Sequence, residues 1–436
     1  MLVGLLTATT CALPLTARPP PLLCVTTAAS LEGVAFCERA LRTPNEFRVR
    51  ALVRNPDSSR AQRLKELGAE VVVADNREVE SLVKAFDGAD GVYACTTWSG
   101  SGFTADGTVK RSDDLDPTFL EESEVEQGLN ILAAAERTPS LSHFVLQSMH
   151  RPGRTNYDHS VPAPLHHRAK WRQEAALQAS TDLSCSWTIL RQPTYLENFA
   201  NDETAAQGTA LRLLRPGLVS GLLGPEEALT VISVSDLGAL AVALLREGPD
   251  AHDQRILAAG SERITGSRLA SAAARVHGAA DFEYRQVPSF VLEYLIPVDY
   301  PKQLARWLSK GGNDEGVVDH AREESFAMCK RLHPEMLSVE DWLVKQGVRE
   351  LPVPKVQVLQ KGVAAMLQRL MREDNPLIEG QGGEQRLDRR AALGLALSTA
   401  WGAGSVLPAL LQPQQPRLPS YLLASEKETR SSFGRL

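Results

Sequence analysis

The sequence has few cysteines, and none of them is placed for a metal site or a disulfide scaffold. The six cysteines are far apart, no two are separated by two residues, and no Cys/His cluster has zinc spacing. We expect free thiols, mostly buried, in a reducing compartment, and no bound metal. The chain also lacks an excess of positive charge, because its net charge is −6. A surface that neutralises a phosphate backbone is therefore not predicted, and nucleic acid is excluded as the default partner.

Composition places the chain among folded globular proteins. Hydrophobic residues make up 43% and charged residues 23%, values that exclude a fully disordered, a collagen-like or a polytopic membrane protein. At 436 residues the chain is two to three times the usual length of a domain. Either one large domain with appendages or two domains would account for this length.

The two ends differ from the rest. Residues 1–20 are apolar and rich in Thr, without an acidic residue, which suits an organellar (plastid-type) targeting segment. The alternative is a frayed N-terminus of a cytoplasmic protein. Residues 349–436 form an extension in which Arg389-Arg390 precedes an uncharged stretch, 391–411, that is long enough to cross a bilayer. Its glycines and alanines make it weakly hydrophobic, so a buried helix, a displaced signal segment or a misjoined gene remain alternatives to membrane attachment.

The middle of the chain alternates short Val/Leu/Ile runs with amphipathic segments, which is typical of a parallel sheet covered by helices. Six strands are predicted between residues 21 and 200, at 22–25, 49–53, 70–74, 91–96, 143–148 and 187–191. Right-handed crossovers make this an α/β doubly wound (Rossmann) sheet with its ligand crevice at the carboxyl ends of the strands. Residues 201–348 are predicted to form a smaller α+β subdomain on the substrate side, with strands at 229–233, 255–258 and 282–287. The long polar loop 99–117 is predicted to be a lid or disordered.

The loop after the first strand is a degenerate phosphate-binding turn. Of three expected glycines only Gly33 is present, while Thr27 and Ser30 occupy the other two positions and could offer hydroxyls to phosphate oxygens. Arg54 ends the second strand where an NAD-specific site would carry an acid, so the predicted cofactor is NADP rather than NAD. Asp75 follows the third strand and is expected either beside the adenine or as the N-cap of the next helix.

Several segments resemble the NmrA-like family of atypical short-chain dehydrogenases. They are residues 50–57 (RALVRNPD), 67–72 (LGAEVV), 126–130 (EQGLN), 188–193 (TILRQP), 197–199 (ENF) and 332–337 (LHPEML). The resemblance covers about residues 21–348 and implies a Rossmann domain, NADP-type cofactor binding and a small C-terminal subdomain that completes a cleft. It also implies cofactor contacts after the fourth and sixth strands, at Thr96, Thr97, Pro193 and Asn198.

Ordinary short-chain dehydrogenases use a Tyr-x-x-x-Lys pair, and here the matching place reads His166-His167-Arg168-Ala169-Lys170. Lys170 is retained and is also expected to contact the cofactor. His166 lies one helical turn earlier, where its imidazole could replace the tyrosine as acid or base at neutral pH, or could form a hydrogen bond with the cofactor instead. Ser148 matches a serine that polarises a carbonyl in the wider superfamily. Tyr157 does not have the Tyr-x-x-x-Lys spacing and is at most a substrate-side residue.

Two functional hypotheses follow from these residues. The first is an NADP-dependent reductase of a small carbonyl or quinone-type substrate, with Lys170, His166 and Ser148 as catalytic residues. The second is a non-catalytic, dinucleotide-sensing regulator or a protein-binding assembly factor, because the loop has lost two glycines and the tyrosine is missing.

Overall fold

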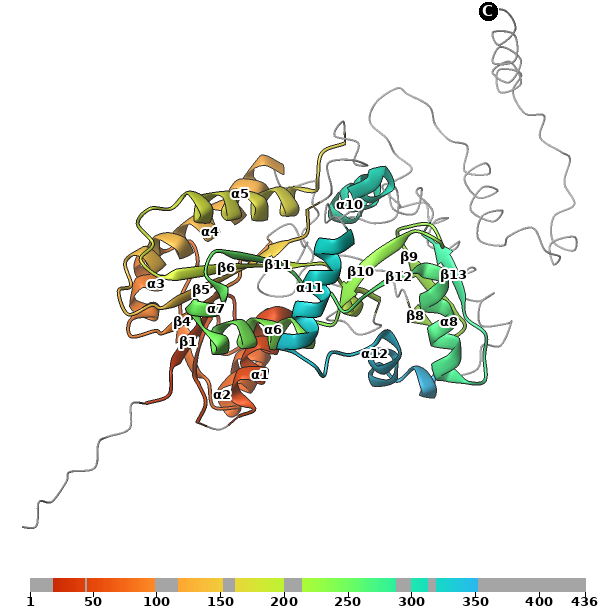
Figure 1. Ribbon diagram of the computed structural model, residues 1–436, viewed down its shortest axis with the longest axis horizontal. Coiled ribbons are helices and arrows are strands. Elements are labelled where there is room, and N and C mark those ends of the chain that lie inside the picture. The colour runs from red at the N-terminus through yellow and green to blue at the C-terminus, as the bar shows by residue number, and fades with distance from the viewer. Residues whose placement is uncertain are drawn as a thin grey trace, which may run out of the picture. The chain divides into compact units, whose positions relative to one another are not determined.

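The computed structural model describes residues 19–43, 45–98, 117–151, 161–199, 214–287, 299–312 and 319–351 (Figure 1). These residues all belong to a compact unit that ends at Lys355, and residues 356–436 form a second unit. Four sequence predictions lie outside the described residues: most of the N-terminal targeting segment 1–20, most of the polar loop 99–117, Tyr157, and the apolar segment 391–411.

The main element is a seven-stranded parallel sheet. Its strands run in the order β11 (Arg255–Ala258), β6 (Ser186–Gln192), β5 (His143–Met149), β4 (Gly91–Ala94), β1 (Leu22–Val25), β2 (Arg48–Val53) and β3 (Glu70–Val73). From β1, the next two strands of the chain, β2 and β3, are added on one side. The chain then crosses to the other side of β1, where β4 pairs with β1 and β5, β6 and β11 follow. The point of reversal between β1 and β4 is where an open α/β sheet forms its ligand crevice.

Helices cover both faces of the sheet (Figure 1). One face carries α1 (Leu31–Leu41), α2 (Ser59–Glu66) and α6 (Val234–Glu247), and the other carries α3 (Val79–Phe86), α4 (Pro117–Glu136) and α5 (Leu165–Ala179). Alternate residues of the central strands enter two separate apolar clusters, as expected for strands that are buried on both sides.

Local sequence explains where several helices begin and end. Ser30 and Ser58 cap α1 and α2, each accepting a hydrogen bond from the backbone N–H three residues later. Gly68 follows α2 with φ of +99°, a left-handed conformation that favours glycine. Ser338 caps α12 (Val339–Lys345), since its hydroxyl oxygen accepts from the N–H of Asp341.

The second region of this unit contains two small sheets. One has the order β12 (Glu262–Thr265), β10 (Ala228–Ile232), β7 (Thr194–Tyr195), and the other β13 (Glu283–Gln286), β9 (Leu218–Gly221), β8 (Leu214–Arg215). The remaining helical elements are the 3-10 turn η3 (Leu196–Phe199), α7 (Pro249–His252), α8 (Gly266–His277), α10 (Asp299–Trp307), the π-turn η4 (Leu308–Gly312), α11 (Asp319–Leu332), α12 (Val339–Lys345) and the 3-10 turn η5 (Val348–Glu350).

One buried and one half-buried carboxylate attach the C-terminal helical segment to the rest of the fold. Asp236 at the start of α6 contacts His333 Nε2 at 3.0 Å and accepts the backbone N–H of Leu337 at 3.0 Å. Glu197 in η3 accepts from Trp342 Nε1 at 3.2 Å and from the N–H of Val234 at 3.0 Å. Each buried oxygen therefore has a donor, as burial requires.

The structure differs from the sequence prediction at two elements. Residues 255–258 form β11, which pairs with β6 as the seventh strand of the main sheet instead of joining the smaller region. A short apolar run gives no information about which sheet it enters, so only its strand character was predictable. Helix α4 begins at Pro117, the last residue of the stretch predicted as a loop, and its first turns are mostly polar and acidic, so they carry little apolar periodicity.

Five of the six cysteines lie in the described ranges, and all five are free thiols, four of them buried. Burial raises the pKa of Cys95 and of Cys24 to about 12. No described helix is long and apolar enough to span a bilayer. Within the same residues, no His, Cys, Asp and Glu side chains are grouped to hold a metal ion.

Candidate functional site

The loop between β1 and α1 keeps the backbone of a phosphate-binding turn although two glycines are missing. Thr27 has a φ of +51°, a left-handed conformation that is unusual for a β-branched residue. Its hydroxyl donates to the carbonyl of Cys95 at 3.0 Å and accepts from Asn76 Nδ2 at 3.0 Å. These contacts hold the strained backbone in place, and they occupy the hydroxyl proton that could otherwise bind a phosphate.

Gly33 is required by the packing of this loop. A Cβ atom at this position would lie 2.6 Å from Ala28 Cα and 2.7 Å from the carbonyl oxygens of Ala28 and Thr27. Real side chains do not approach backbone atoms so closely, so only glycine lets α1 pack against the loop.

The start of α1 fits an anionic ligand. The backbone N–H groups of Ala29, Leu31 and Glu32 make no hydrogen bond with any described residue, whereas Ser30 Oγ accepts from the N–H of Gly33 at 3.0 Å. Free N–H groups at a helix N-terminus are the usual donors to a pyrophosphate. The Ser30 hydroxyl accepts one bond here and still has its own proton to donate.

Two arginines lie next to this loop. Arg54 is exposed at the end of β2 and makes no hydrogen bond or ion pair with the rest of the described chain. Arg60 on α2 donates from Nη1 to the carbonyl of Ala29 at 3.0 Å, so its guanidinium group lies at the loop itself. This arrangement places positive charge beside a loop of the kind that binds phosphate groups.

Asp75 and Asn76, after β3, complete this side of the crevice. Asp75 Oδ1 accepts the N–H of Arg77 at 3.0 Å in a local turn, and the cap of α3 is Glu78. The alternative prediction that Asp75 caps the next helix is therefore wrong. Asn76 is almost fully buried and donates to Thr27 and to the carbonyl of Cys95 at 3.2 Å, which links β1, β3 and β4.

Thr96 and Thr97 follow β4 and are held by α4. Gln127 contacts the Thr97 backbone on both sides, accepting from its N–H and donating to its carbonyl, each at 3.0 Å. Thr96 Oγ1 donates to Glu124 Oε1 at 2.8 Å. The loop after β4 is therefore fixed to the helix that carries Glu124.

Glu124 brings two of the three predicted catalytic residues together, His166 and Lys170. Its carboxylate is fully buried and lies 2.6 Å from His166 Nδ1 and 3.8 Å from Lys170 Nζ. Burial alone would raise the pKa of Glu124, but His166, Lys170 and the Thr96 hydroxyl together lower it below its ordinary value. An ionised carboxylate thus lies between an imidazole and an ammonium group, next to the carboxyl end of β4.

Lys170 is 1% exposed, so its ammonium group is covered in this structure. It donates to Gln147 Oε1 at 2.7 Å. Gln147 Nε2 donates to Gln192 Oε1, and Gln192 in turn contacts the hydroxyl of Tyr195. Tyr195 reaches back to Glu32 Oε1 at 2.8 Å, so a continuous hydrogen-bonded chain runs from Lys170 to the first turn of α1.

The other predicted site residues have different surroundings. Ser148 is fully buried at the end of β5, and its hydroxyl makes no hydrogen bond with any residue that the structure describes. Such an orphaned polar group is compatible with a ligand contact. Pro193 is buried between β6 and β7, and Asn198 is exposed in η3. Neither contacts the Glu124 group through a described hydrogen bond.

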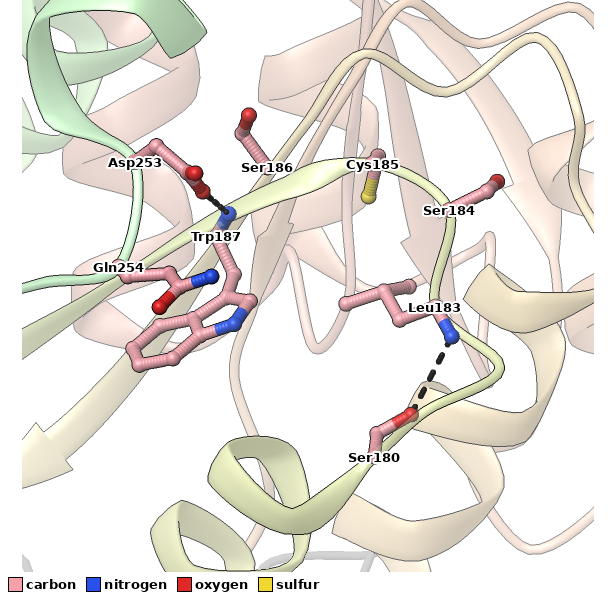
Figure 2. Close-up of a pocket in the computed structure, with 8 residues that line it drawn as sticks. All are labelled: Ser180, Leu183, Ser184, Cys185, Ser186, Trp187, Asp253 and Gln254. Atoms are coloured by element: carbon pink, nitrogen blue, oxygen red, sulfur yellow. Dashed lines mark hydrogen bonds between the residues drawn. The ribbon is translucent and has the colours of Figure 1, made fainter.

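A cavity of about 200 Å³ lies elsewhere, around the amino end of β6 (Figure 2). Its wall is polar and consists of Ser180, Leu183, Ser184, Cys185, Ser186, Trp187, Asp253 and Gln254. This cavity lies at the amino ends of the strands, whereas Thr96 and Glu124 lie at the carboxyl ends, so it is not the predicted cofactor crevice.

Comparison with known proteins agrees with this architecture. Residues 22–343 match the model of the NmrA-like family. The chain belongs to the NmrA-like family. An NmrA-like family domain-containing oxidoreductase, notA of Aspergillus sp. (strain MF297-2), is 30% identical over 171 residues, which are 38% of this chain and 44% of that protein. The chain spans less than half the length of the first curated relatives that it matches.

Solved structures of NmrA-like and related proteins share the fold. NmrA, described as a negative transcriptional regulator, has a TM-score of 0.58 at 15% identity, with 77% of this chain and 99% of NmrA covered. NmrA has been solved in complex with NAD and with NADP. An NADPH-dependent quinone oxidoreductase of Escherichia coli, in complex with NADPH, has a TM-score of 0.53 at 18% identity, with 74% and 99% covered.

Within this NmrA-like protein, the sequence analysis missed four residues that shape the crevice: Glu32, Arg60, Glu124 and Tyr195. Glu124 belongs to the acidic series Glu121, Glu122, Glu124 and Glu126, which reads as a solvated helix face. Its burial depends on partners that α5 supplies, and these pairings have no local sequence signal. Arg60 was detectable in principle, because a second arginine follows Arg54 closely in the sequence.

Proposed function

We propose that this NmrA-like protein binds NADP(H) between β1 and β4 and reduces a small carbonyl or quinone-type substrate. The observation that carries the proposal is the buried group of Glu124, His166 and Lys170 beside that crevice. A buried carboxylate beside an imidazole and an ammonium group is expensive to fold, and groups of this kind are concentrated at functional sites.

The residues present fit the phosphate end of the cofactor. The free N–H groups of Ala29, Leu31 and Glu32 would hold the pyrophosphate, together with the Ser30 hydroxyl. Arg54 and Arg60 would hold the 2′-phosphate, which favours NADP over NAD.

At the other end, the chain's own residues would orient the reactants and supply a proton. When bound, a reduced nicotinamide dinucleotide supplies a hydride. Lys170 would exchange its bond to Gln147 for the nicotinamide ribose, and His166 would pass a proton to the substrate oxygen. Ser148, whose hydroxyl lacks a partner among the described residues, would hold the substrate carbonyl.

Turnover tests the proposal directly. We expect the full chain to oxidise NADPH in the presence of a panel of quinones and aldehydes. A Lys170→Met variant should lose this activity while keeping its far-UV circular dichroism. An exposed control, Arg172→Met, removes an ion pair with Glu122 and should stay active. Full activity in Lys170→Met would contradict the catalytic assignment.

A second function is favoured by one observation, the strained Thr27 in place of a loop glycine. In this alternative the protein binds the dinucleotide without turning it over and responds to it as a regulator or a protein-binding factor. NADPH binding without oxidation of any acceptor in the panel would support it.

Attachment to a membrane through residues 391–411 is a separate proposal, and so is an organellar location. Fractionation of cells that express the chain with or without residues 385–436 tests the first. The proposal requires that the membrane-bound fraction disappears with the truncation, and an unchanged distribution would end it.

A further inference from the structure

The hydrogen bond between Glu124 and His166 determines which nitrogen of the imidazole can exchange a proton. We propose that Glu124 is a positioning residue that holds His166 with its proton on Nδ1, so that Nε2 is the atom that gains and loses a proton. This inference rests on the proposed function, in which His166 passes a proton to the substrate.

The donor and acceptor roles follow from the chemistry of the two groups. Glu124 Oε2 lies 2.6 Å from His166 Nδ1, a distance typical of a charge-assisted hydrogen bond. An ionised carboxylate only accepts hydrogen bonds, so the shared hydrogen belongs to Nδ1. In a neutral imidazole the other nitrogen, Nε2, then carries the lone pair.

The carboxylate is itself held from two other elements. Thr96, just after β4, donates to Oε1 at 2.8 Å, and Lys170 Nζ lies 3.8 Å from the same oxygen. Gln173 on α5 donates to the Glu124 backbone carbonyl at 2.7 Å. With its backbone and both oxygens fixed, Glu124 presents one oxygen to the ring at a defined position.

Lys170 keeps a positive charge beside the Glu124 carboxylate when the imidazole of His166 loses its proton. If His166 were the only cation beside Glu124, loss of its proton would leave a buried and uncompensated anion. Because Lys170 is fully buried next to the same carboxylate, a positive partner remains in both protonation states of His166. This is the electrostatic condition that a proton-exchanging histidine needs.

Neighbouring pairs between the same helices show what a purely structural contact looks like. Glu121 pairs with Arg168, and Glu122 pairs with Arg172 at 2.5 Å. Arginine stays charged at every accessible pH, so those pairs cannot exchange a proton. Among the described pairs between α4 and α5, the pair at position 124 is the one that combines a fully buried carboxylate with a titratable partner.

The tautomer of His166 can be measured by nitrogen NMR on the full chain with ¹⁵N-labelled histidine, with His166→Asn to assign the signals. At a pH where the ring is neutral, we expect the wild type to show a protonated Nδ1 and an unprotonated Nε2. In Glu124→Gln the side-chain amide can donate as well as accept, so we expect a mixture of tautomers or a predominant Nε2–H form. Glu121→Gln is the matched control and should keep the wild-type spectrum.

A wild-type His166 with its proton on Nε2 would overturn the inference, and so would a Glu124→Gln spectrum identical to the wild type. If Glu124→Gln does not fold, Glu124→Asp is the second variant. It keeps the negative charge on a side chain that is one methylene group shorter, and we expect a smaller fraction of His166 in the Nδ1–H tautomer than in the wild type. An Asp variant with the full wild-type tautomer would contradict the positioning role.

The kinetic readout uses NADPH with 1,4-naphthoquinone as the acceptor. We expect Glu124→Gln to lower kcat by at least about a hundredfold, the scale of general acid catalysis, while KM for NADPH stays within a few-fold. Equal kcat values in the variant and the wild type would overturn the role in proton transfer. A wild type that binds no NADPH would refute the proposed function, and the NMR result on Glu124 and His166 would still stand by itself.

Discussion

Replacing Gly33 with alanine tests whether the loop after β1 is a working binding turn. The added Cβ atom would lie within 2.7 Å of three backbone atoms in Thr27 and Ala28, where ordinary contacts between carbon atoms begin near 3.5 Å. The loop must therefore move by roughly 1 Å, because backbone atoms cannot rotate away as a side chain can.

Two opposing contributions determine the effect on stability. Overpacking of this kind lowers the free energy of unfolding by about 1 to 3 kcal/mol, whereas replacing glycine with alanine inside a helix raises it by about 1 kcal/mol. We expect Gly33→Ala to lower the free energy of unfolding by about 1 kcal/mol. The displaced loop also moves the free N–H groups of Ala29, Leu31 and Glu32, so NADPH affinity should fall at least about tenfold.

Gly68→Ala is the matched control. Its Cβ would meet nothing within 4 Å, but its φ of +99° is unfavourable for alanine, at a cost of about 1 kcal/mol. Urea denaturation should therefore show similar losses for the two variants, while calorimetric titration shows weakened NADPH binding only for Gly33→Ala. Wild-type affinity in Gly33→Ala, or equal loss of affinity in both variants, would refute the role assigned to the loop.

Three further predictions concern charge and burial. Burial lowers the pKa of His143 from its ordinary value to about 4. Below pH 6.5 the unfolded chain therefore binds a proton at His143 that the folded chain does not, and the free energy of unfolding should fall as the pH drops from about 6.5 to about 4. His143→Gln should flatten that part of the stability profile measured by urea denaturation, and an unchanged slope would contradict the shift. His333→Ala leaves Asp236 without its buried partner and should cost about 3 kcal/mol in the same assay, against less than about 1 kcal/mol for the exposed Arg331→Ala. Glu32→Gln removes a carboxylate beside the pyrophosphate position and should raise the affinity for NADPH and NADH alike by about fivefold, or about 1 kcal/mol; a lower affinity would show that Glu32 assists binding.

The elements that the sequence predicts well are those with local signals. The strands Leu22–Val25 and Arg255–Ala258 have the predicted bounds, and the glycines that follow α2 and α3 adopt a left-handed backbone. Hydrophobic periodicity and caps act within a few residues, so one sequence suffices to read them.

The features that escaped prediction depend on distant partners. The assignment of β11 to the main sheet depends on pairing with β6, more than 60 residues earlier in the chain. The importance of Glu124 depends on His166 and Lys170 from another helix, and that of Glu32 depends on Tyr195. None of these contacts follows from the composition or periodicity of the segments involved.

The central claim is that the crevice between β1 and β4 binds NADP(H), and calorimetric titration of the full chain with NADPH and NADH tests it most directly. Arg54 is exposed and makes no hydrogen bond or ion pair within the described structure, so Arg54→Ala should leave the fold intact. We expect the wild type to bind NADPH more tightly than NADH. The loss of one charged hydrogen bond, about 1.5 kcal/mol, should weaken NADPH binding about tenfold in Arg54→Ala and leave NADH binding unchanged. Absence of NADPH binding to the wild type, or an equal loss for both dinucleotides in the variant, would contradict the account.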